Sequence, residues 1–363
     1  MKCSVKSYIV FILLLATSLS YARTCERVMY YPSVDQHGDS LILSGRISLP
    51  TNKRPKGIIL LFHYTIAANS EVPSTSRIYE SHFFRDDYVL IMPDYLGYGL
   101  TRDLTPPYLC GDLEAHNGVD MLIASLPLLD SLQTDVARDS LYLIGFSQGA
   151  AAALWALRYI EQNYAYRFHL KRCFAGSGPY DVAATYDDAV ANNKTGFPMT
   201  IPTLVIGTSV AYDLNLSRDY FFTPEMNARY DDYIAAKKYK IIPIYFKMHD
   251  KKVSRWLSKE GMNKTLPETR RMYDGFMRSS IVHYPIDNSP VGRDTIVNDW
   301  IPSTPLYIFH STTDDLVPFC NAAHIRRYLA DYPDVIYDFD DYGTHVHSLN
   351  TFFSRVRKLL KGE

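Results

Sequence analysis

A serine between two glycines follows a short apolar run near the middle of the chain. Residues 141–144 read Leu-Tyr-Leu-Ile, residues 145–149 read Gly-Phe-Ser-Gln-Gly, and four alanines follow at 150–153. A strand that runs through Gly-x-Ser-x-Gly into a helix predicts a sharp turn, which presents the serine hydroxyl above the sheet edge. The helix would direct its free N–H groups at negative charge that develops in acyl transfer. Because the motif alone also occurs in ordinary connections, the flanking strand and helix carry the interpretation of Ser147 as a nucleophile.

A nucleophilic serine needs a histidine base, and that histidine needs a carboxylate to orient it. Asp314 and Asp315 follow the apolar run at residues 305–309. The Leu-Val-Pro turn behind them favours Asp314, with Asp315 as the alternative. His345 and His347 follow the last apolar run, and a glycine precedes them. A flexible loop that swings an imidazole over the serine favours His345, with His347 as the alternative.

A tetrahedral oxyanion needs two hydrogen-bond donors. The backbone N–H of Gln148, directly after the nucleophile, is one donor by geometry. The second donor should come from the loop after the apolar run at residues 57–62, which makes it Tyr64 or Thr65. The sequence leaves the choice between these two residues open.

Apolar runs and helical patterns alternate around these residues. Continuous apolar runs are typical of strands buried on both faces of a parallel sheet. The predicted strands are 41–49, 57–62, 88–92, 141–144, 172–175, 305–309 and 335–339. The predicted helices are 112–132, the stretch after the serine to about 163, 320–330 and 348–360. This alternation predicts a mostly parallel sheet with helices on both faces, whose ligands bind beyond the carboxyl ends of the strands.

The alternation breaks between residues 182 and 298. Strand signals fade there, and stretches such as 230–239 and 268–277 have helical character. We therefore predict a core formed by residues 23–181 and 299–363, with a mainly helical lid inserted at 182–298. Its aromatic side chains either line an acyl pocket or form a core of the lid itself, and the second role is the commoner one. They are Phe221, Phe222, Tyr230, Tyr233 and Trp256.

The composition and the net charge bear on the size of the domain and on the class of partner. The chain has 363 residues, 47% of them hydrophobic, which is enough for one large domain with an insertion. Its formal net charge is −1, with 38 basic and 39 acidic residues and no basic stripe. Nucleic acid is therefore not an expected partner. The oligomeric state is left open.

The first 22 residues have the pattern of a secretory signal. Lys2 and Lys6 precede the apolar stretch 9–16, and small residues follow up to Ala22. The apolar stretch is too short to span a bilayer, so no stable membrane anchor is expected. The sequence predicts cleavage near Ala22 and export to the periplasm or the exterior.

Export changes the interpretation of the cysteines. Apart from Cys3, they are Cys25, Cys110, Cys173 and Cys320, an even number. In an oxidising compartment, one or two disulfides are expected among them, with open connectivity. No Cys-x-x-Cys pair is present, and no metal site or other cofactor is expected.

Taken together, these residues resemble the α/β-hydrolase superfamily, and more narrowly secreted lipases and esterases of the secretory-lipase type. The stretches that carry the resemblance are the serine turn at 145–149, Asp314, His345, residues 63–65, 71–74, 93–99, 107–109 and 178–181. The resemblance covers essentially the whole chain after residue 22. It implies an α/β-hydrolase fold with a helical lid inserted after the sixth strand. It also implies a serine hydrolase that cleaves carboxylic esters.

The expected partner is thus an ester of a small molecule, a lipid or a glycan. Three alternatives remain at this stage. The same residues serve a serine peptidase of this superfamily, or an acyltransferase that uses an alcohol in place of water. A non-catalytic binding protein that kept the fold is the third, and the presence of all three catalytic residue types argues against it.

Overall fold

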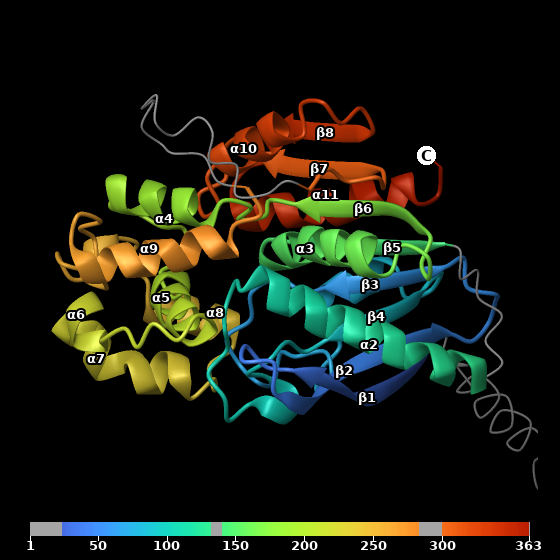
Figure 1. Ribbon diagram of the computed structural model, residues 1–363, viewed down its shortest axis with the longest axis horizontal. Coiled ribbons are helices and arrows are strands. Elements are labelled where there is room, and N and C mark those ends of the chain that lie inside the picture. The colour runs from blue at the N-terminus through green and yellow to red at the C-terminus, as the bar shows by residue number, and fades with distance from the viewer. Residues whose placement is uncertain (1–23, 132–139, 283–299, 363) are drawn as a thin grey trace, which may run out of the picture.

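The computed structural model of the protein describes residues 24–131, 140–282 and 300–362. Within these ranges, eight strands form one sheet, and helices cover both of its faces (Figure 1). The predicted mostly parallel sheet is thereby confirmed. The predicted signal peptide, residues 1–22, lies outside the described residues. No helix in the described ranges combines the length and the hydrophobicity that crossing a bilayer requires.

The strands occur in the sheet in the order β1-β2-β4-β3-β5-β6-β7-β8. They are β1 (Thr24–Val34), β2 (Ser40–Pro50), β3 (Ile58–Phe62), β4 (Val89–Pro93), β5 (Leu141–Phe146), β6 (Leu170–Gly176), β7 (Leu306–Ser311) and β8 (Val335–Asp340). The first two strands join the sheet antiparallel, and every pair from β4 to β8 is parallel. All residues of β3, β4 and β7 are buried, as a strand covered on both faces requires.

Helices form a layer on each face of this sheet. The helices are η1 (Tyr79–Phe83), η2 (Gly99–Thr101), α2 (Gly111–Ser131), α3 (Gln148–Asn163), α10 (Cys320–Tyr328) and α11 (His345–Leu359). One hydrophobic cluster joins α2, α3 and α10 to one face of the sheet. A second cluster joins α11 and the residues around η1 to the opposite face. The central strands are therefore closed to solvent on both faces, and their ends are the accessible places.

The register brings four loops to one edge of the sheet. Phe62 at the end of β3 pairs with Gly145 of β5, and Phe146 pairs with Gly176 of β6. Gly176 in turn pairs with Phe309 of β7, and Ser311 pairs with Asp340 of β8. The loops that leave β3, β5, β7 and β8 consequently lie next to one another.

The chain between β6 and β7 folds into helices that lie beside this edge, and we call residues 182–279 the cap (Figure 1). Its helices are α4 (Val182–Ala191), α5 (Thr200–Ala211), α6 (Arg218–Phe221), α7 (Pro224–Tyr230), η3 (Asp231–Ala235), α8 (Ile241–Lys247), η4 (Val253–Arg255) and α9 (Pro267–Ser279). A hydrophobic cluster of its own holds them together and reaches the core at Ala67, Tyr108 and Leu109. The predicted end of the insertion, residue 298, lies outside the described residues.

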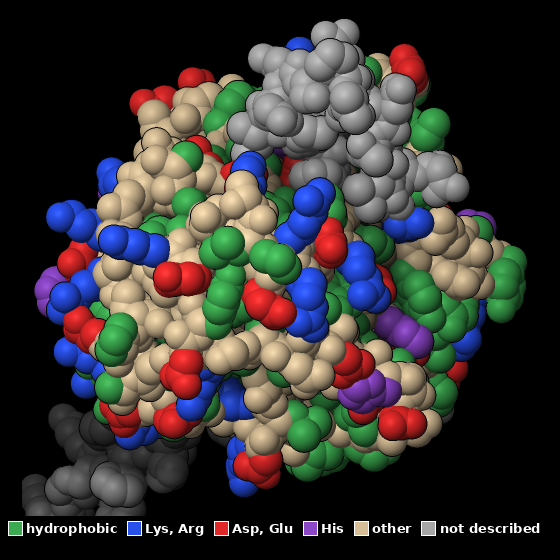
Figure 2. All heavy atoms as spheres, turned by 60° about the vertical axis from the view of Figure 1, so that its left-hand side comes forward, with side chains coloured by type: hydrophobic (Ala, Val, Ile, Leu, Met, Phe, Trp, Pro, Cys, Tyr) green, Lys and Arg blue, Asp and Glu red, His purple; other side chains and the backbone are tan. Residues whose placement is uncertain are grey.

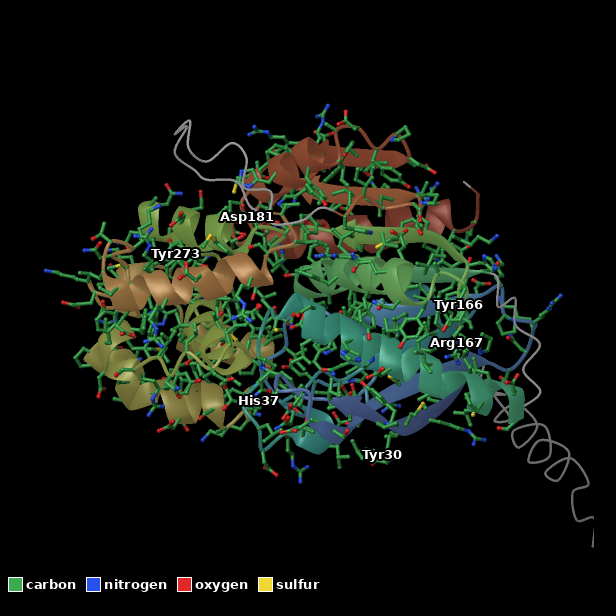
Figure 3. All side chains as sticks on the ribbon, in the orientation of Figure 1. Tyr30, His37, Tyr166, Arg167, Asp181 and Tyr273 are labelled. Atoms are coloured by element: carbon green, nitrogen blue, oxygen red, sulfur yellow. The ribbon has the colours of Figure 1, made fainter. Side chains whose placement is uncertain are left out.

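The first cap helix is fixed to the core at its N-terminus. The Asp181 carboxylate caps α4 by accepting a hydrogen bond from Ala184 N (2.9 Å) and also contacts His324 Nδ1 on α10 (2.8 Å). Asn321 Oδ1 accepts the N–H of Asp181 at 2.8 Å. In Figure 3, Asp181 lies where the cap meets the core.

Three expectations from the sequence need correction. First, strand β1 was not predicted. Most of its side chains are half or fully exposed at the edge of the sheet, so its sequence contains no apolar run. Helix α11 begins at His345 rather than at residue 348, since Ser348 N already donates to Thr344 O (3.0 Å). The expected disulfides are absent among the described residues. Their four cysteines are all free thiols: Cys25 on β1, Cys110 before α2, Cys173 on β6 and Cys320 on α10.

Candidate active site

The serine turn combines a strained backbone with close packing. Ser147 has φ 57° and ψ −125°, between the end of β5 and the start of α3. Its N–H donates to Gly176 O on the neighbouring strand (2.8 Å). A Cβ atom on Gly145 would collide with the backbone of Gly149, and a Cβ on Gly149 would collide with Phe62 O. The two glycines therefore let the turn pack closely against β3. The positive φ of Ser147 is unfavourable for a residue with a side chain, and the close packing and the hydrogen bond to Gly176 maintain it.

Three side chains from three loops form one hydrogen-bonded chain. His345 Nε2 lies 2.8 Å from Ser147 Oγ, and His345 Nδ1 lies 2.7 Å from Asp314 Oδ2. Ser147 and His345 are buried, and so is the side chain of Asp314. With Nδ1–H donated to the carboxylate, Nε2 is left as the acceptor of the serine proton. The arrangement allows proton transfer from the hydroxyl to the ring.

The alternatives for acid and base lie elsewhere in the structure. Asp315 uses Oδ1 to accept the backbone N–H of His345 (3.3 Å), and its other oxygen lies 3.5 Å from Lys251 Nζ. The His347 ring contacts the Thr344 hydroxyl at 3.2 Å and is exposed. Thus Asp314 and His345 belong to the hydrogen-bonded chain that ends at the serine. Asp315 instead contacts the backbone at the start of α11 and is not part of that chain.

The surroundings of Asp314 keep it ionised. Burial would raise the pKa of Asp314, but the nearby His345 and hydrogen bonds hold that pKa below its usual value. Its second oxygen, Oδ1, accepts two backbone N–H groups, from Leu316 (3.0 Å) and Val317 (2.8 Å). These bonds fix the carboxylate against the backbone of the turn that follows it. A fixed carboxylate can thus stabilise a positive charge on the ring.

A second histidine, not singled out from the sequence, lies beside this carboxylate. His310 Nε2 lies 2.9 Å from Val317 O and 3.9 Å from Asp314 Oδ2, and the side chain is fully buried. Burial lowers the pKa of His310, which keeps its ring neutral. His310 is too far from Asp314 Oδ2 to form a hydrogen bond with it, so this oxygen remains bonded to His345 Nδ1 at 2.7 Å.

The candidate oxyanion donors differ in availability. Gln148 is the first residue of α3, where backbone N–H groups have no partner within the helix. The sequence offered Tyr64 as one of two alternatives for the second donor. In the structure, the N–H of Tyr64 already donates to Glu80 Oε1 at 3.0 Å. Within the described residues, the backbone N–H of Thr65 has no hydrogen-bond partner. Its side-chain hydroxyl is 2.7 Å from Tyr108 OH, which fixes the loop.

Two buried glutamates support these donors, and the sequence offered no pattern to find them. Glu80 accepts the Tyr64 N–H, and burial raises the pKa of Glu80 to about 7. Glu114 on α2 accepts from Gln148 Nε2 (2.7 Å) and from Leu109 N (3.1 Å), and burial raises the pKa of Glu114 to about 8. One carboxyl therefore connects the residue after the nucleophile with the loop before α2.

Asp94, in a Pro-Asp-Tyr turn after β4, has a structural role. Its carboxylate accepts from Ser44 Oγ (2.6 Å) and from Ser74 N (2.8 Å), and it is buried. It therefore holds the loop after β4 against β2. Among the described residues, no group of three or more His, Cys, Asp or Glu side chains is placed to hold a metal ion.

The fold agrees with that of known hydrolases. The structure matches a rice cell wall degrading esterase, LipA from Xanthomonas oryzae, with a TM-score of 0.75 and 18% identity, over 96% of this chain and 92% of that chain. It matches Candida antarctica lipase A with a TM-score of 0.62 and 15% identity, over 95% of this chain and 80% of that chain. The chain thus has the α/β-hydrolase fold, in the form found in lipases and esterases.

One curated relative is similar in sequence. The secreted triacylglycerol lipase LIP3 of Malassezia restricta is 21% identical over 271 residues, 73% of this chain. The matched region is 51% of that protein, so the chain spans about half the length of the curated relative it matches. No protein-family model matches the chain.

Proposed function

We propose that this chain is an exported serine hydrolase that cleaves carboxylic esters. The observation that carries the proposal is the hydrogen-bonded chain from Ser147 Oγ through His345 to Asp314 at 2.8 and 2.7 Å. The α/β-hydrolase fold, shared with lipases and esterases, supports this reaction class. Export rests on the signal pattern in residues 1–22 and on the word "secreted" in the name of the curated relative.

In the first half of the proposed reaction, the ester carbonyl is attacked by Ser147 Oγ while His345 Nε2 takes the hydroxyl proton. A C–O bond forms, and the carbonyl π electrons move to the oxygen. The N–H groups of Gln148 and Thr65 stabilise this oxyanion. His345 then gives its proton to the departing alcohol, which leaves Ser147 acylated.

In the second half, water replaces the alcohol. His345 takes a proton from a water molecule while the water oxygen attacks the acyl carbon. The same two N–H groups stabilise the second oxyanion. Collapse of the intermediate breaks the bond to Ser147 Oγ, which recovers its proton from His345. Asp314 stays ionised throughout and stabilises the charged ring twice in each cycle.

The charges on the cap side of the molecule bear on the class of substrate. On the face shown in Figure 2, which brings the cap side forward, acidic and basic side chains are interspersed. With a net charge of −1, the protein has no field that would select a polyanion. A neutral ester is therefore the proposed substrate class, and no metal or organic cofactor enters the proposed steps.

The test is the reactivity of the serine. We expect a fluorophosphonate to label the wild type, and the wild type to hydrolyse p-nitrophenyl acetate. Ser147→Ala should abolish labelling and lower turnover by about 10⁴-fold or more with an unchanged melting temperature. Ser177→Ala, a buried serine at the end of the neighbouring strand, is the matched control and should keep both. Equal turnover in Ser147→Ala and wild type would refute the proposal.

A further inference from the structure

A small cavity begins at Ser147 and ends inside the cap. Its volume is about 40 Å³. Leu109 and Val317, from core loops, form its sides, and Ile201 and Leu204, from α5, close it on the cap side. These four side chains are buried, so the cavity beside the serine is narrow and has apolar walls.

The cap wall is held in place. Tyr186 of α4 also lines the cavity, and its OH donates to Gly261 O at 2.9 Å. Its ring contacts those of Tyr273 and Phe276, with centroids 5.6 and 5.0 Å apart. A ring that is hydrogen-bonded at one end and packed against two other rings does not rotate away to lengthen the cavity.

The lining selects for an uncharged alkyl group. None of the residues that line this cavity in the described chain is an acid or a base. Two threonine hydroxyls in the wall are already donated: Thr185 donates to Asp181 O at 2.9 Å, and Thr200 donates to Phe197 O at 2.7 Å. The third, Thr195, accepts the N–H of Phe197 at 3.4 Å. A charged acyl group would therefore lose its hydration without gaining a partner of opposite charge.

The volume limits the length of that alkyl group. A cavity of about 150 Å³ in a protein interior holds one benzene molecule, which has six carbon atoms. The cavity at Ser147 has about a quarter of this volume, at about 40 Å³. Beyond the carbonyl group, which would lie at the serine, it has room for one or two carbon atoms.

We infer that the enzyme acts on esters of acetic and propionic acid, and that α4 and α5 of the cap set this limit. The inference rests on the proposed ester hydrolysis and specifies its substrate class. Longer acyl chains would have to displace packed side chains in α4 or α5, which costs transition-state stabilisation. Preference for the shortest acyl groups thus follows from the packing of the cap.

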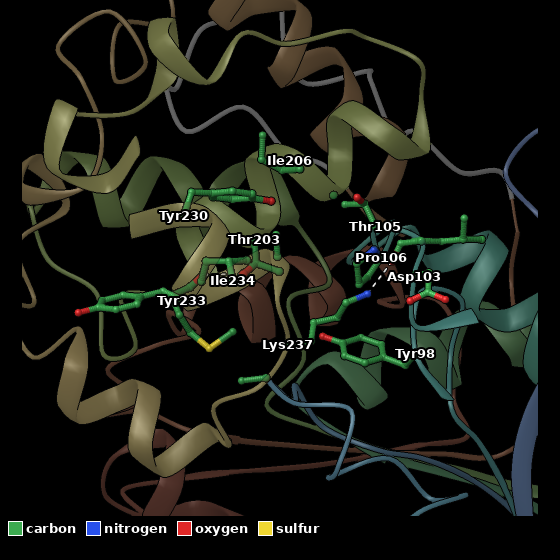
Figure 4. A pocket seen from close by; sticks show the side chains of 15 residues that line it. Tyr98, Asp103, Thr105, Pro106, Thr203, Ile206, Tyr230, Tyr233, Ile234 and Lys237 are labelled. Carbon is green, nitrogen blue, oxygen red and sulfur yellow. Dashed lines mark hydrogen bonds between the residues drawn. The ribbon is translucent and has the colours of Figure 1, made fainter. Parts of the chain in front are cut away.

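The opposite face of α5 supplies a control. A separate cavity of about 150 Å³ lies there, lined by Thr203 and Ile206 together with Tyr230, Tyr233 and Lys237 (Figure 4). Ser147 does not line it. A large-to-small change at Ile206 therefore perturbs the same helix without enlarging the cavity at the serine.

The experiment measures kcat/KM for p-nitrophenyl esters from acetate to palmitate. We expect the wild type to be fastest on acetate or propionate and at least about tenfold slower on octanoate. Leu204→Ala should move the optimum to butyrate or hexanoate, and Ala189→Val, also in the cavity wall, should lower the ratio of propionate to acetate turnover. Ile206→Ala should leave the optimum unchanged. Melting temperatures establish that each variant is folded, and if Leu204→Ala does not fold, Ala189→Val decides.

The outcomes separate the two proposals. A wild type that is labelled by fluorophosphonate but prefers octanoate or longer esters would overturn this inference and leave ester hydrolysis standing. An unchanged profile in folded Leu204→Ala and Ala189→Val would also overturn it. A folded wild type without labelling or turnover on any ester would overturn the proposed function, and this inference with it.

Discussion

At the carboxyl edge of the sheet, hydrogen bonds and backbone geometry hold the side chains, whereas hydrophobic packing holds them in the cap. Each polar atom of Asp314 and His345 that the proposed chemistry uses has a partner within 3.0 Å. The cap is built around buried aromatic residues such as Phe221, Phe222 and Trp256. These three form its own core, while Tyr230 and Tyr233 line the cavity away from Ser147.

Polar contacts join the two regions at several points. Lys237 of the cap donates to the core carbonyl groups of Gly97 and Leu104, both at 2.6 Å. Glu71 of the core accepts the N–H of Ile241 at the start of α8, at 3.0 Å. Under the proposed function, this difference corresponds to a division of roles: the core would determine the reaction, and the cap would determine which acyl group reaches it.

The largest effect should come from the carboxylate at the core edge. Asp314→Asn removes the charge that stabilises the protonated His345 and favours the wrong tautomer, so kcat should fall by about 10⁴-fold. Asp315→Asn is the matched control and should cost less than about tenfold. Asp315 is partly exposed, and it contacts the backbone N–H of His345 and the Lys251 side chain but not the His345 ring. Ester kinetics measure both. Equal losses in the two variants would assign the orienting role to both aspartates.

A smaller effect should come from the contact between the regions. Lys237→Met leaves two carbonyl groups without their donor, so the free energy of unfolding should fall by about 1–3 kcal/mol. The exposed neighbour Lys238→Met is the control, and its loss should be within about 1 kcal/mol. Urea denaturation measures both. Fluorophosphonate labelling should persist in each variant, and its loss in folded Lys237→Met would show that the reaction depends on the cap.

Glu114 should make stability depend on pH. Burial raises the pKa of Glu114 from its ordinary value of 4.5 to about 8. Between these values, the carboxyl is protonated in the folded protein and ionised in the unfolded chain, so stability should fall as pH rises from about 5 to 8. The loss should be on the order of a few kcal/mol.

In Glu114→Gln, the amide cannot ionise, and the part of the slope due to Glu114 should disappear. Denaturant midpoints at pH 5, 6, 7 and 8 measure it for both proteins. Glu80, whose pKa is raised to about 7, contributes a slope of the same sign in both. If the denaturant midpoints of wild type and Glu114→Gln depend on pH in the same way, Glu114 is not the source of the pH dependence.

The smallest effect is expected from reduction. Because the four described cysteines are free thiols on separate elements, dithiothreitol should leave the melting temperature and ester turnover unchanged. A disulfide would instead contribute about 2–4 kcal/mol. A fall of several degrees on reduction would therefore contradict the structure, and thiol titration of the unfolded chain would count the free groups directly.

Local patterns in the sequence were enough to predict most of the core. The buried strands β3 to β5 are continuous apolar runs, and the serine turn has its own motif. The half-exposed edge strand β1 was missed because antiparallel edge strands leave no such run. The start of α11 was placed three residues late, since a glycine and threonine before His345 indicate a loop as well as a helix N-terminus.

Long-range contacts decided what local patterns could not. Whether Tyr64 or Thr65 offers a free N–H depends on Glu80, which is 16 residues away and carries no motif. The partner of Gln148 is Glu114, 34 residues away, and its raised pKa results from burial alone. Such pairs form only when the loops after separate strands meet at one sheet edge.

The sequence by itself determined the sheet, the strained serine turn and the loops from which an acid and a base would come, because these depend on residue types within a few positions of one another. Only the tertiary structure decided which aspartate meets which histidine and which amide remains free. It also decided how small the cavity behind Ser147 is. These properties depend on distances between side chains far apart in the chain, which are set when the core and the cap pack together.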